Sequence, residues 1–211
     1  MRGARTKVLA YHKPRGVVTT HDDELGRETV YDRLRATLDA SLAVEDWHAI
    51  GRLDQDTTGL LLVTNDGALV HHATQPATKV PKTYRALVKG RLDEGTLQAL
   101  RDGVELSGGL GRSAPCEVLL EVHQTATSWI TLTLTEGKNR QIRRMLLAVG
   151  SQVIRLARVR VGGIALDVDE DRWRLLGDDE VRHGLGFEPR ALVTPPQPAT
   201  RARRAHSRRR P

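Results

Sequence analysis

Asp54 and Arg52 are the residues of this chain best placed to do chemistry, because they begin a polar loop between two apolar segments. Residues 47–53 have β-forming character, and residues 60–63 are a short continuous apolar run typical of a buried strand. Loops held by rigid strands often carry catalytic groups. A carboxylate there can act as a nucleophile or a general base. A solvated acidic turn is the alternative.

Two later segments add candidate residues. Lys82 and Tyr84 head an expected strand, residues 83–88, and their spacing of two puts both side chains on one face. An expected helix has Asn139 as its N-cap and Gly150 as its stop. At about 100° per residue, this helix has an apolar and a basic face. The apolar face holds Ile142, Met145, Leu146 and Val149, and the basic face holds Arg140, Arg143 and Arg144.

Hydrophobic periodicity predicts the other elements. Strands are expected at residues 7–11, 116–122, 128–135 and 153–160. Helices are expected at residues 30–38, 68–74 and 94–101, the last with Asp93 as its cap and Gly103 near its end. Strands outnumber helices, and no internal repeat is present.

In this order, the run GRLDQDTTGLLLVTNDG, the segment KTY and the segment EGKNRQIRRM resemble the RsuA-type family of RNA pseudouridine synthases. The resemblance spans residues 8–176. It implies an α/β (α+β) fold with a mixed, mostly antiparallel sheet, flanking helices and a central RNA-binding cleft. The N-terminal S4-type module of most members is expected to be missing, because the first catalytic strand starts near Met1. The chain is thus most similar to the short large-subunit form of the family.

The resemblance also implies the roles of three catalytic residues. Asp54 would be the carboxylate beside the sugar, which attacks the sugar carbon, adds to the base, or removes a sugar proton to give a glycal; we favour the glycal. Arg143 would keep Asp54 charged and oriented. Tyr84 would stack on the target uracil and assist a late proton transfer. A core-filling aromatic is the alternative for Tyr84.

RNA-binding residues are expected around these three. Arg52 would fill the gap that a flipped uridine leaves, or else form a salt bridge with Asp56 or a neighbouring carboxylate. Leu156 would form an apolar wall of the base pocket, or else only pack in the core. The phosphate contacts are expected from Lys82, Lys138, Arg140 and Arg144.

Composition agrees with an intracellular RNA enzyme. The 211 residues are 39% hydrophobic, enough for a core, and lack any stretch of membrane-spanning length. The single cysteine, Cys116, excludes an intramolecular disulfide and a cysteine-based metal site. No motif implies a nucleotide cofactor or a metal. We expect a cytoplasmic monomer without an obligate protein partner, with residues 1–188 as the catalytic domain.

The net charge of +7 is unevenly distributed. Seven of the 33 basic residues lie from Arg190 onward, which leaves 26 basic against 26 acidic side chains in residues 1–189. We expect residues 189–211, rich in proline and arginine, to form a disordered tail that binds RNA phosphates or only adds solubility. A phosphate-facing surface is expected from Lys138, Arg140, Arg143, Arg144, Arg155, Arg158 and Arg160.

These expectations converge on isomerisation of a specific uridine in ribosomal RNA, with large-subunit (23S) RNA favoured and tRNA as the alternative. A competing class is a non-catalytic RNA-binding or ribosome-assembly factor with the same fold. It is disfavoured because Asp54, Tyr84 and Arg143 are all present. A two-carboxylate glycoside hydrolase is disfavoured because Asp54 and Asp56 lie on one short loop and cannot flank a sugar.

Truncation before Pro195 tests the role of the tail. If its arginines bind phosphates, the truncated chain should lose part of the salt dependence of RNA affinity, because fewer counterions are released on binding. The measurement is the slope of log affinity against log salt for a structured RNA. An unchanged slope would mean that the tail does not contact RNA.

Overall fold

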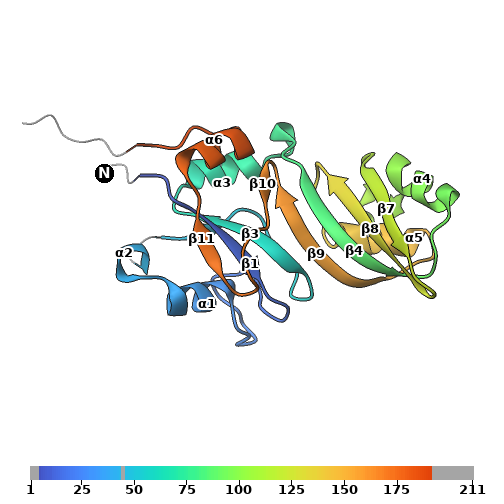
Figure 1. Ribbon diagram of the computed structural model, residues 1–211, viewed down its shortest axis with the longest axis horizontal. Helices are drawn as coiled ribbons and strands as arrows, with labels where there is room; N and C mark the ends of the chain where they lie inside the picture. The colour runs from blue at the N-terminus through green and yellow to red at the C-terminus, as the bar shows by residue number, and fades with distance from the viewer. Residues whose placement is uncertain (1–4, 44–45, 192–211) are drawn as a thin grey trace, which may run out of the picture.

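In the computed structural model, residues 5–43 and 46–191 are described, and they form a long sheet with helices packed around it (Figure 1). The nine-stranded sheet has the order β11-β1-β3-β9-β4-β8-β7, with β10 beside β9 and β2 beside β3. Its named strands pair antiparallel, except β3 with β9. The expected mixed, mostly antiparallel sheet with flanking helices is thus confirmed.

The main sheet consists of β1 (Val8–Lys13), β2 (His48–Ala49), β3 (Thr58–Thr64), β4 (Lys82–Lys89), β7 (Glu117–His123), β8 (Thr127–Leu134), β9 (Val153–Val161), β10 (Ile164–Ala165) and β11 (Trp173–Leu175). A separate hairpin pairs β5 (Glu105–Leu106) with β6 (Gly111–Arg112). The helices are α1 (Val30–Thr37), α2 (Ala40–Ala43), α3 (Gly67–Thr74), the 3-10 helix η1 (Pro76–Thr78), α4 (Glu94–Asp102), α5 (Gln141–Ala148) and α6 (Asp178–Leu185). Within the described ranges, no helix is long and apolar enough to cross a membrane.

The strands β1 and β3 are covered on both faces because both of their faces are apolar. Leu60, Leu61, Leu62 and Val63 are each 0% exposed. Alternate residues of the two strands pack on α3 and α6 on one side and on α1 and α2 on the other (Figure 1). Full burial of each such side chain contributes about 1.5–3 kcal/mol. This run therefore fixes β3 in the interior.

The strands β4, β7 and β8 bury one face only. In β8, alternate residues from Ser128 to Leu134 are buried and those between them are partly exposed, as expected for a half-buried strand. Helices α4 and α5 cover the buried face (Figure 1). In α5 the expected apolar face is buried at Ile142, Met145 and Leu146, and Val149 packs beside it, partly buried.

The two parts of the sheet meet where β3 runs parallel to β9. Thr58 lies opposite Ala157, and Gly59 lies opposite Arg158. Gly59 has a φ of +105°, and a Cβ atom there would lie 2.3 Å from the carbonyl oxygen of Arg158. No side chain can be accommodated that close to backbone, so the crossing requires glycine.

Most of the expected strands and helices are confirmed to within two residues of their bounds. The expected cap of α4 is confirmed, since the Asp93 side chain accepts from the Thr96 amide and Gly103 follows the helix. The expected strand at residues 47–53 is wrong in extent, because only β2 pairs there. Trp47 is instead a core residue whose indole N–H donates to the Leu42 carbonyl. Helices α2 and α6 and the short strands β5, β6, β10 and β11 were not predicted.

Asp66 joins the two ends of the described chain. Its carboxylate is 1% exposed and accepts from the Thr6 hydroxyl at 2.6 Å, Arg190 Nε at 2.8 Å and the Ala68 amide at 3.0 Å. Burial would raise the pKa of Asp66, but the hydrogen bonds from Arg190, Thr6 and Ala68 outweigh burial and lower it. Arg190, from the expected tail, is thus bound to the folded body. Residues 192–211 of that tail lie outside the described residues.

Asp66→Asn should lower the free energy of unfolding by about 1–3 kcal/mol, because it removes a buried charge that pairs with Arg190 and replaces one of two acceptor oxygens by an NH2 donor. Urea unfolding at neutral pH measures the change. Asp178→Asn is the matched control, since Asp178 pairs with Arg5 in an exposed ion pair. The control should change stability by at most about 1 kcal/mol. Equal effects of the two variants would show that the Asp66 network adds nothing special.

Candidate active site

The polar loop between Leu53 and β3 is fixed by hydrogen bonds and by packing of Leu53 in the core. The Thr57 amide donates to the Asp54 carbonyl at 3.0 Å, which closes a turn. Gly16, from the turn after β1, exchanges two hydrogen bonds with Gln55, of 2.8 and 3.0 Å. Leu53 is 5% exposed and packs in the core beside α1. The loop thereby presents the Asp54 side chain, 32% exposed, just before the first residue of β3.

A buried lysine lies at the base of this loop. Lys13, at the end of β1, is 0% exposed, and its Nζ donates to the carbonyls of Pro14 and Thr57, both at 2.9 Å. Burial lowers the pKa of Lys13 to about 8, although the nearby carboxylates of Asp56 and Asp54 favour its charged form. Because a buried cation is unfavourable unless it is paired, Lys13 and the loop carboxylates stabilise one another.

Two arginines reach the loop, in a pairing that differs from the expected one. Arg140 Nη1 lies 3.5 Å from Asp54 Oδ2, and Arg140 Nη2 lies 3.2 Å from Asp56 Oδ2. Arg143 Nη2 lies 3.1 Å from Asp56 Oδ2 and donates to the Asp56 carbonyl at 3.2 Å. The expected partner of Asp54 was Arg143, but the guanidinium in ion-pair contact with it is that of Arg140.

The reason lies in the backbone at the start of α5. Arg140, and not the expected Asn139, is the N-cap, with a left-handed φ of 48° that is uncommon outside glycine. The Gln141 side chain, 4% exposed, accepts from the Lys138 amide at 2.9 Å and donates to the Glu136 carboxylate. This bridge fixes the turn that directs Arg140 to the loop. The expected stop is confirmed, because α5 ends just before the left-handed Gly150.

Asp56 is the more strongly paired of the two loop carboxylates. Burial by itself would raise its pKa, but the hydrogen bond from Arg140 and the positive charges of Arg143 and Arg140 outweigh burial. Together they hold the pKa of Asp56 below its ordinary value. The carboxylate is therefore charged at neutral pH.

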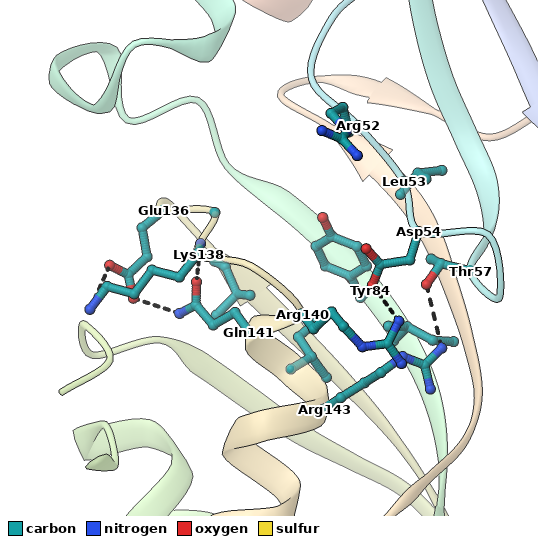
Figure 2. A pocket seen from close by; sticks show the side chains of 14 residues that line it. Arg52, Leu53, Asp54, Thr57, Tyr84, Glu136, Lys138, Arg140, Gln141 and Arg143 are labelled. Carbon is teal, nitrogen blue, oxygen red and sulfur yellow. Dashed lines mark hydrogen bonds and ion pairs between the residues drawn. The ribbon is translucent and has the colours of Figure 1, made fainter. Parts of the chain in front are cut away.

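Tyr84 and Leu156 line a pocket of about 110 Å³ beside the loop (Figure 2). Tyr84 comes from β4 and packs against the cores of both parts of the sheet, and Leu156 comes from β9 and is 7% exposed. Asp54, Arg140 and Arg143 line the polar side. An apolar cavity of about 150 Å³ is known to hold a benzene molecule. The pocket is somewhat smaller than that cavity and of the order of size of a single six-membered ring.

Arg52 and Lys82 lie near this pocket in different ways. Arg52 lines it and is exposed, and its side chain has no ion pair or hydrogen bond within the part of the chain that is described. The alternative salt bridge with Asp56 is not formed. Lys82 is on the same strand face as Tyr84 but does not line the pocket. Burial and the nearby charge of Arg158 lower the pKa of Lys82.

Lys138 and Arg144 contact the β5–β6 hairpin. Lys138 Nζ donates to the carbonyls of Leu110 at 3.0 Å and Arg112 at 2.7 Å. Arg144 Nη1 donates to the Ser107 carbonyl at 2.6 Å. Their expected contact with RNA stays a prediction, and in the free chain these donors hold the hairpin against α5.

Arg158 is not part of a phosphate-facing surface, and that expectation is wrong. It is 3% exposed, its Nε donates to the Leu60 carbonyl at 2.7 Å, and its Nη2 is buried without a partner. Strand alternation could have shown this, because Arg158 lies two residues after the inward Leu156. The same signal could have found Lys13, which was missed and lies two residues after the buried Tyr11.

The arrangement suits chemistry on a ring attached to a charged or polar group. It combines a carboxylate at the rim, an aromatic ring inside and two arginines in ion-pair contact with the loop carboxylates. In the described ranges, no group of three or more His, Cys, Asp or Glu side chains is placed to hold a metal ion.

Comparison with known proteins identifies related chains. A sequence model of RNA pseudouridylate synthases matches residues 7–148. Ribosomal large subunit pseudouridine synthase B of Salmonella typhi is 43% identical over 160 residues, which cover 76% of this chain and 53% of that protein. The chain therefore spans about half the length of that relative.

Two further comparisons cover more of the related chain. Ribosomal large subunit pseudouridine synthase E of Vibrio vulnificus (strain CMCP6) is 35% identical over 184 residues, which cover 81% of this chain and 75% of that protein. A crystal structure of a pseudouridylate synthase is similar with a TM-score of 0.73 and 32% sequence identity, covering 84% of this chain and 73% of that one. The match to the family model, residues 7–148, includes the loop, β4 and α5.

Lys13 should give the stability of the chain a distinct pH dependence. Its pKa is about 8 in the folded state against an ordinary value of 10.5, so the unfolded state binds more protons between these pH values. The free energy of unfolding should therefore rise with pH across this range, by on the order of 1–3 kcal/mol relative to Lys13→Met. Urea unfolding across the range measures the difference.

Lys89→Met is the control, because Lys89 is exposed at the end of β4. It should follow the pH dependence of the unchanged chain. Parallel curves for the chain and its Lys13→Met variant would show that Lys13 does not titrate in this range.

Proposed function

We propose that this chain, which belongs to the RNA pseudouridylate synthase family, converts a specific uridine of ribosomal RNA to pseudouridine. The observation that carries the proposal is Asp54, a partly exposed carboxylate at the rim of a ring-sized pocket that contains Tyr84. The family match covers the loop, the strand and the first helix residues that build this pocket. The names and similarity of the relatives support the same reaction.

The reaction makes three demands on the site. It breaks the bond between uracil N1 and ribose C1′, turns the detached base, and joins C5 to C1′, while one hydrogen moves from C5 to N1. No atom is oxidised or reduced overall, so no redox cofactor is required. The site must supply an ionised carboxylate beside the sugar, retain the base, and exclude water that would hydrolyse the intermediate.

Asp54 is placed to act on the sugar. Its side chain lies near Tyr84 at the pocket, and its one ion pair among the described residues is the long contact with Arg140 (Figure 2). Of the three possible roles, we favour removal of the C2′ proton to give a glycal. Asp54 would hold that proton while the base turns and then return it to C2′ when C5 bonds to C1′.

Tyr84 retains the base. Its ring offers a stacking surface inside the pocket, and Leu156 provides an apolar wall beside it. Within the described part of the chain, no hydrogen bond ties down the Tyr84 hydroxyl. The hydroxyl is therefore free to assist the late proton transfer away from C5.

Arg52 accompanies base flipping. A stacked uridine cannot reach Asp54, and its extrusion costs about a few kcal/mol. Arg52 stands at the pocket mouth with its guanidinium unpaired within the described ranges, so it can occupy the position that the uridine leaves. Lys82, Lys138, Arg140 and Arg144 are proposed to contact the RNA backbone around it.

Large-subunit RNA is the proposed substrate, because both named relatives are large-subunit enzymes. We propose that the chain acts in the cytoplasm as a monomer without an obligate protein partner. We propose that the arginine-rich residues 192–211 add sequence-independent attraction to the RNA.

Pseudouridine mapping of total RNA tests the proposal. Cells that lack this protein should miss a site that the intact gene restores and an Asp54→Asn gene does not, because an amide cannot act as the base. Asp169→Asn is the matched control, since Asp169 is exposed and far along the chain from the loop. If no RNA site changes, a non-catalytic RNA-binding factor becomes the better description.

A further inference from the structure

The strands β4, β7, β8 and β9 have an open face, opposite the face on which α4 and α5 pack. The covered face carries Ala86 and Ile130, which belong to the core (Figure 1). The side chains of the open face are at least partly exposed, and two of them are apolar, Leu119 at 63% and Val122 at 47% exposure. Exposed apolar side chains that cluster mark an interaction site, whereas scattered ones do not.

Strand register brings the apolar side chains of this face into one row. Val122 on β7 lies opposite Trp129 on β8, which lies opposite Leu87 on β4. Leu87 in turn lies opposite Arg155 on β9. Residues directly opposite one another in antiparallel strands have their side chains on the same face. The row therefore crosses all four strands, from three apolar side chains to an exposed arginine.

Unpaired cations follow the β4 and β9 side of this row. Arg155, Arg160 and Lys89 are exposed, and none has an ion pair or a side-chain hydrogen bond in residues 5–43 and 46–191. Arg160 lies opposite Thr83, four residues along β4 from Leu87, so the two arginines are about 13 Å apart along the strand. The expected phosphate-facing surface is thus divided between the α5 side of the sheet and its open face.

Trp129 is held in place as a stacking surface. The guanidinium of Arg85 lies over its indole, 4.3 Å from the ring centroid, and Arg85 Nε donates to Glu121 at 2.8 Å. Glu121 also accepts from the Thr131 hydroxyl at 2.6 Å, so the guanidinium is fixed from its other side. Aromatic rings and guanidinium planes are both surfaces on which unpaired nucleic-acid bases stack.

We propose that the open face is a second RNA-binding surface, which takes a single-stranded segment of the RNA away from the target uridine. The inference rests on the proposed function, because that function makes RNA the partner of the chain. The bases lie on the apolar row over β7 and β8, and the phosphates follow the cations of β4 and β9. The face is defined by Leu87, Lys89, Leu119, Val122, Trp129, Arg155 and Arg160.

Charge complementarity favours RNA as the occupant. The four strands place four cations and two carboxylates on this face, and one of each is already joined in the ion pair of Arg85 with Glu121. Residues 192–211 of the chain include six arginines and no acidic residue, so the cations of the open face repel them. A strand of phosphates with unpaired bases matches both the free cations and the apolar row.

Removal of charge from the open face is the first test. Arg155→Gln combined with Arg160→Gln should make the slope of log affinity against log salt shallower by about 1.4, since each phosphate contact on a single strand contributes about 0.7. The probe is an oligocytidylate, which contains no uridine for the catalytic pocket, and fluorescence anisotropy measures its affinity. Arg35→Gln combined with Arg172→Gln is the matched control, since both residues are exposed, in α1 and just before β11. The control should leave the slope unchanged.

Trp129→Leu tests the stacking surface. The change keeps the position apolar and removes the ring, so the affinity for the oligocytidylate should fall by about 10-fold, a size typical of one lost base stack. Trp173→Leu is the control, because it removes a partly exposed indole beside α1. It should leave the affinity unchanged, and urea unfolding checks that each variant is folded.

Ultraviolet cross-linking locates the bound oligocytidylate directly. It should attach the probe to peptides from β7 or β8. Attachment only to residues 51–57 or to α5 overturns the inference, as do an unchanged slope in the double variant or an unchanged affinity in Trp129→Leu. Self-association of the unchanged chain that Trp129→Leu abolishes, measured by sedimentation, also overturns it and assigns the face to a second copy.

Pseudouridine mapping separates this inference from the proposed function. If mapping finds no site for the unchanged chain while the variants of the open face lose affinity as expected, the proposed function fails and the RNA-binding surface stands. If a mapped site depends on Asp54 while those variants bind the oligocytidylate like the unchanged chain, the proposed function stands and the second surface is rejected.

Discussion

The short parallel crossing of β3 and β9 is the constraint on which the candidate site depends. Gly59 allows the two backbones to approach, and the loop with Asp54 begins β3 at that point. The strand β9 carries Leu156 beside the crossing, and β4 places Tyr84 opposite Arg158 on the other side of β9. Three segments far apart in sequence thus meet within about two strand spacings of 4.8 Å each. Any side chain at position 59 would displace all of them together.

The charges at this crossing interact as one group of three cations and two anions. Lys13 lies beneath the loop, Arg140 and Arg143 approach from α5, and Asp54 and Asp56 lie between them. Burying any one of these charged side chains is unfavourable unless oppositely charged partners lie beside it. The loop conformation, the ionisation of its carboxylates and the position of the start of α5 are therefore coupled. This coupling places two carboxylates side by side on one short loop, each in contact with a guanidinium.

Elements with strong periodicity could be predicted from the sequence, and those without it could not. The apolar run of β3 and the Asp93 cap and Gly103 end of α4 carry enough local signal to fix an element. The segment around Trp47 carries a misleading signal, because its apolar residues pack in the core without extending the ladder beyond β2. Helix α6 buries only Val181 and Leu185, too few residues to show a helical face. Its place is set by tertiary packing against α3 and β10.

The kinds of residue at the site could be predicted from the sequence, whereas the groups that each side chain contacts could not. Lys138 and Arg144 donate to carbonyls of the β5–β6 hairpin, which no periodic pattern predicted, and Arg158 donates to the Leu60 carbonyl inside the sheet. A side chain that already donates to backbone has fewer N–H groups left for a phosphate. A count of basic residues along the sequence therefore overestimates the surface open to RNA. Arg52, unpaired within the described residues, then stands out as the cation at the pocket that can bind without such a loss.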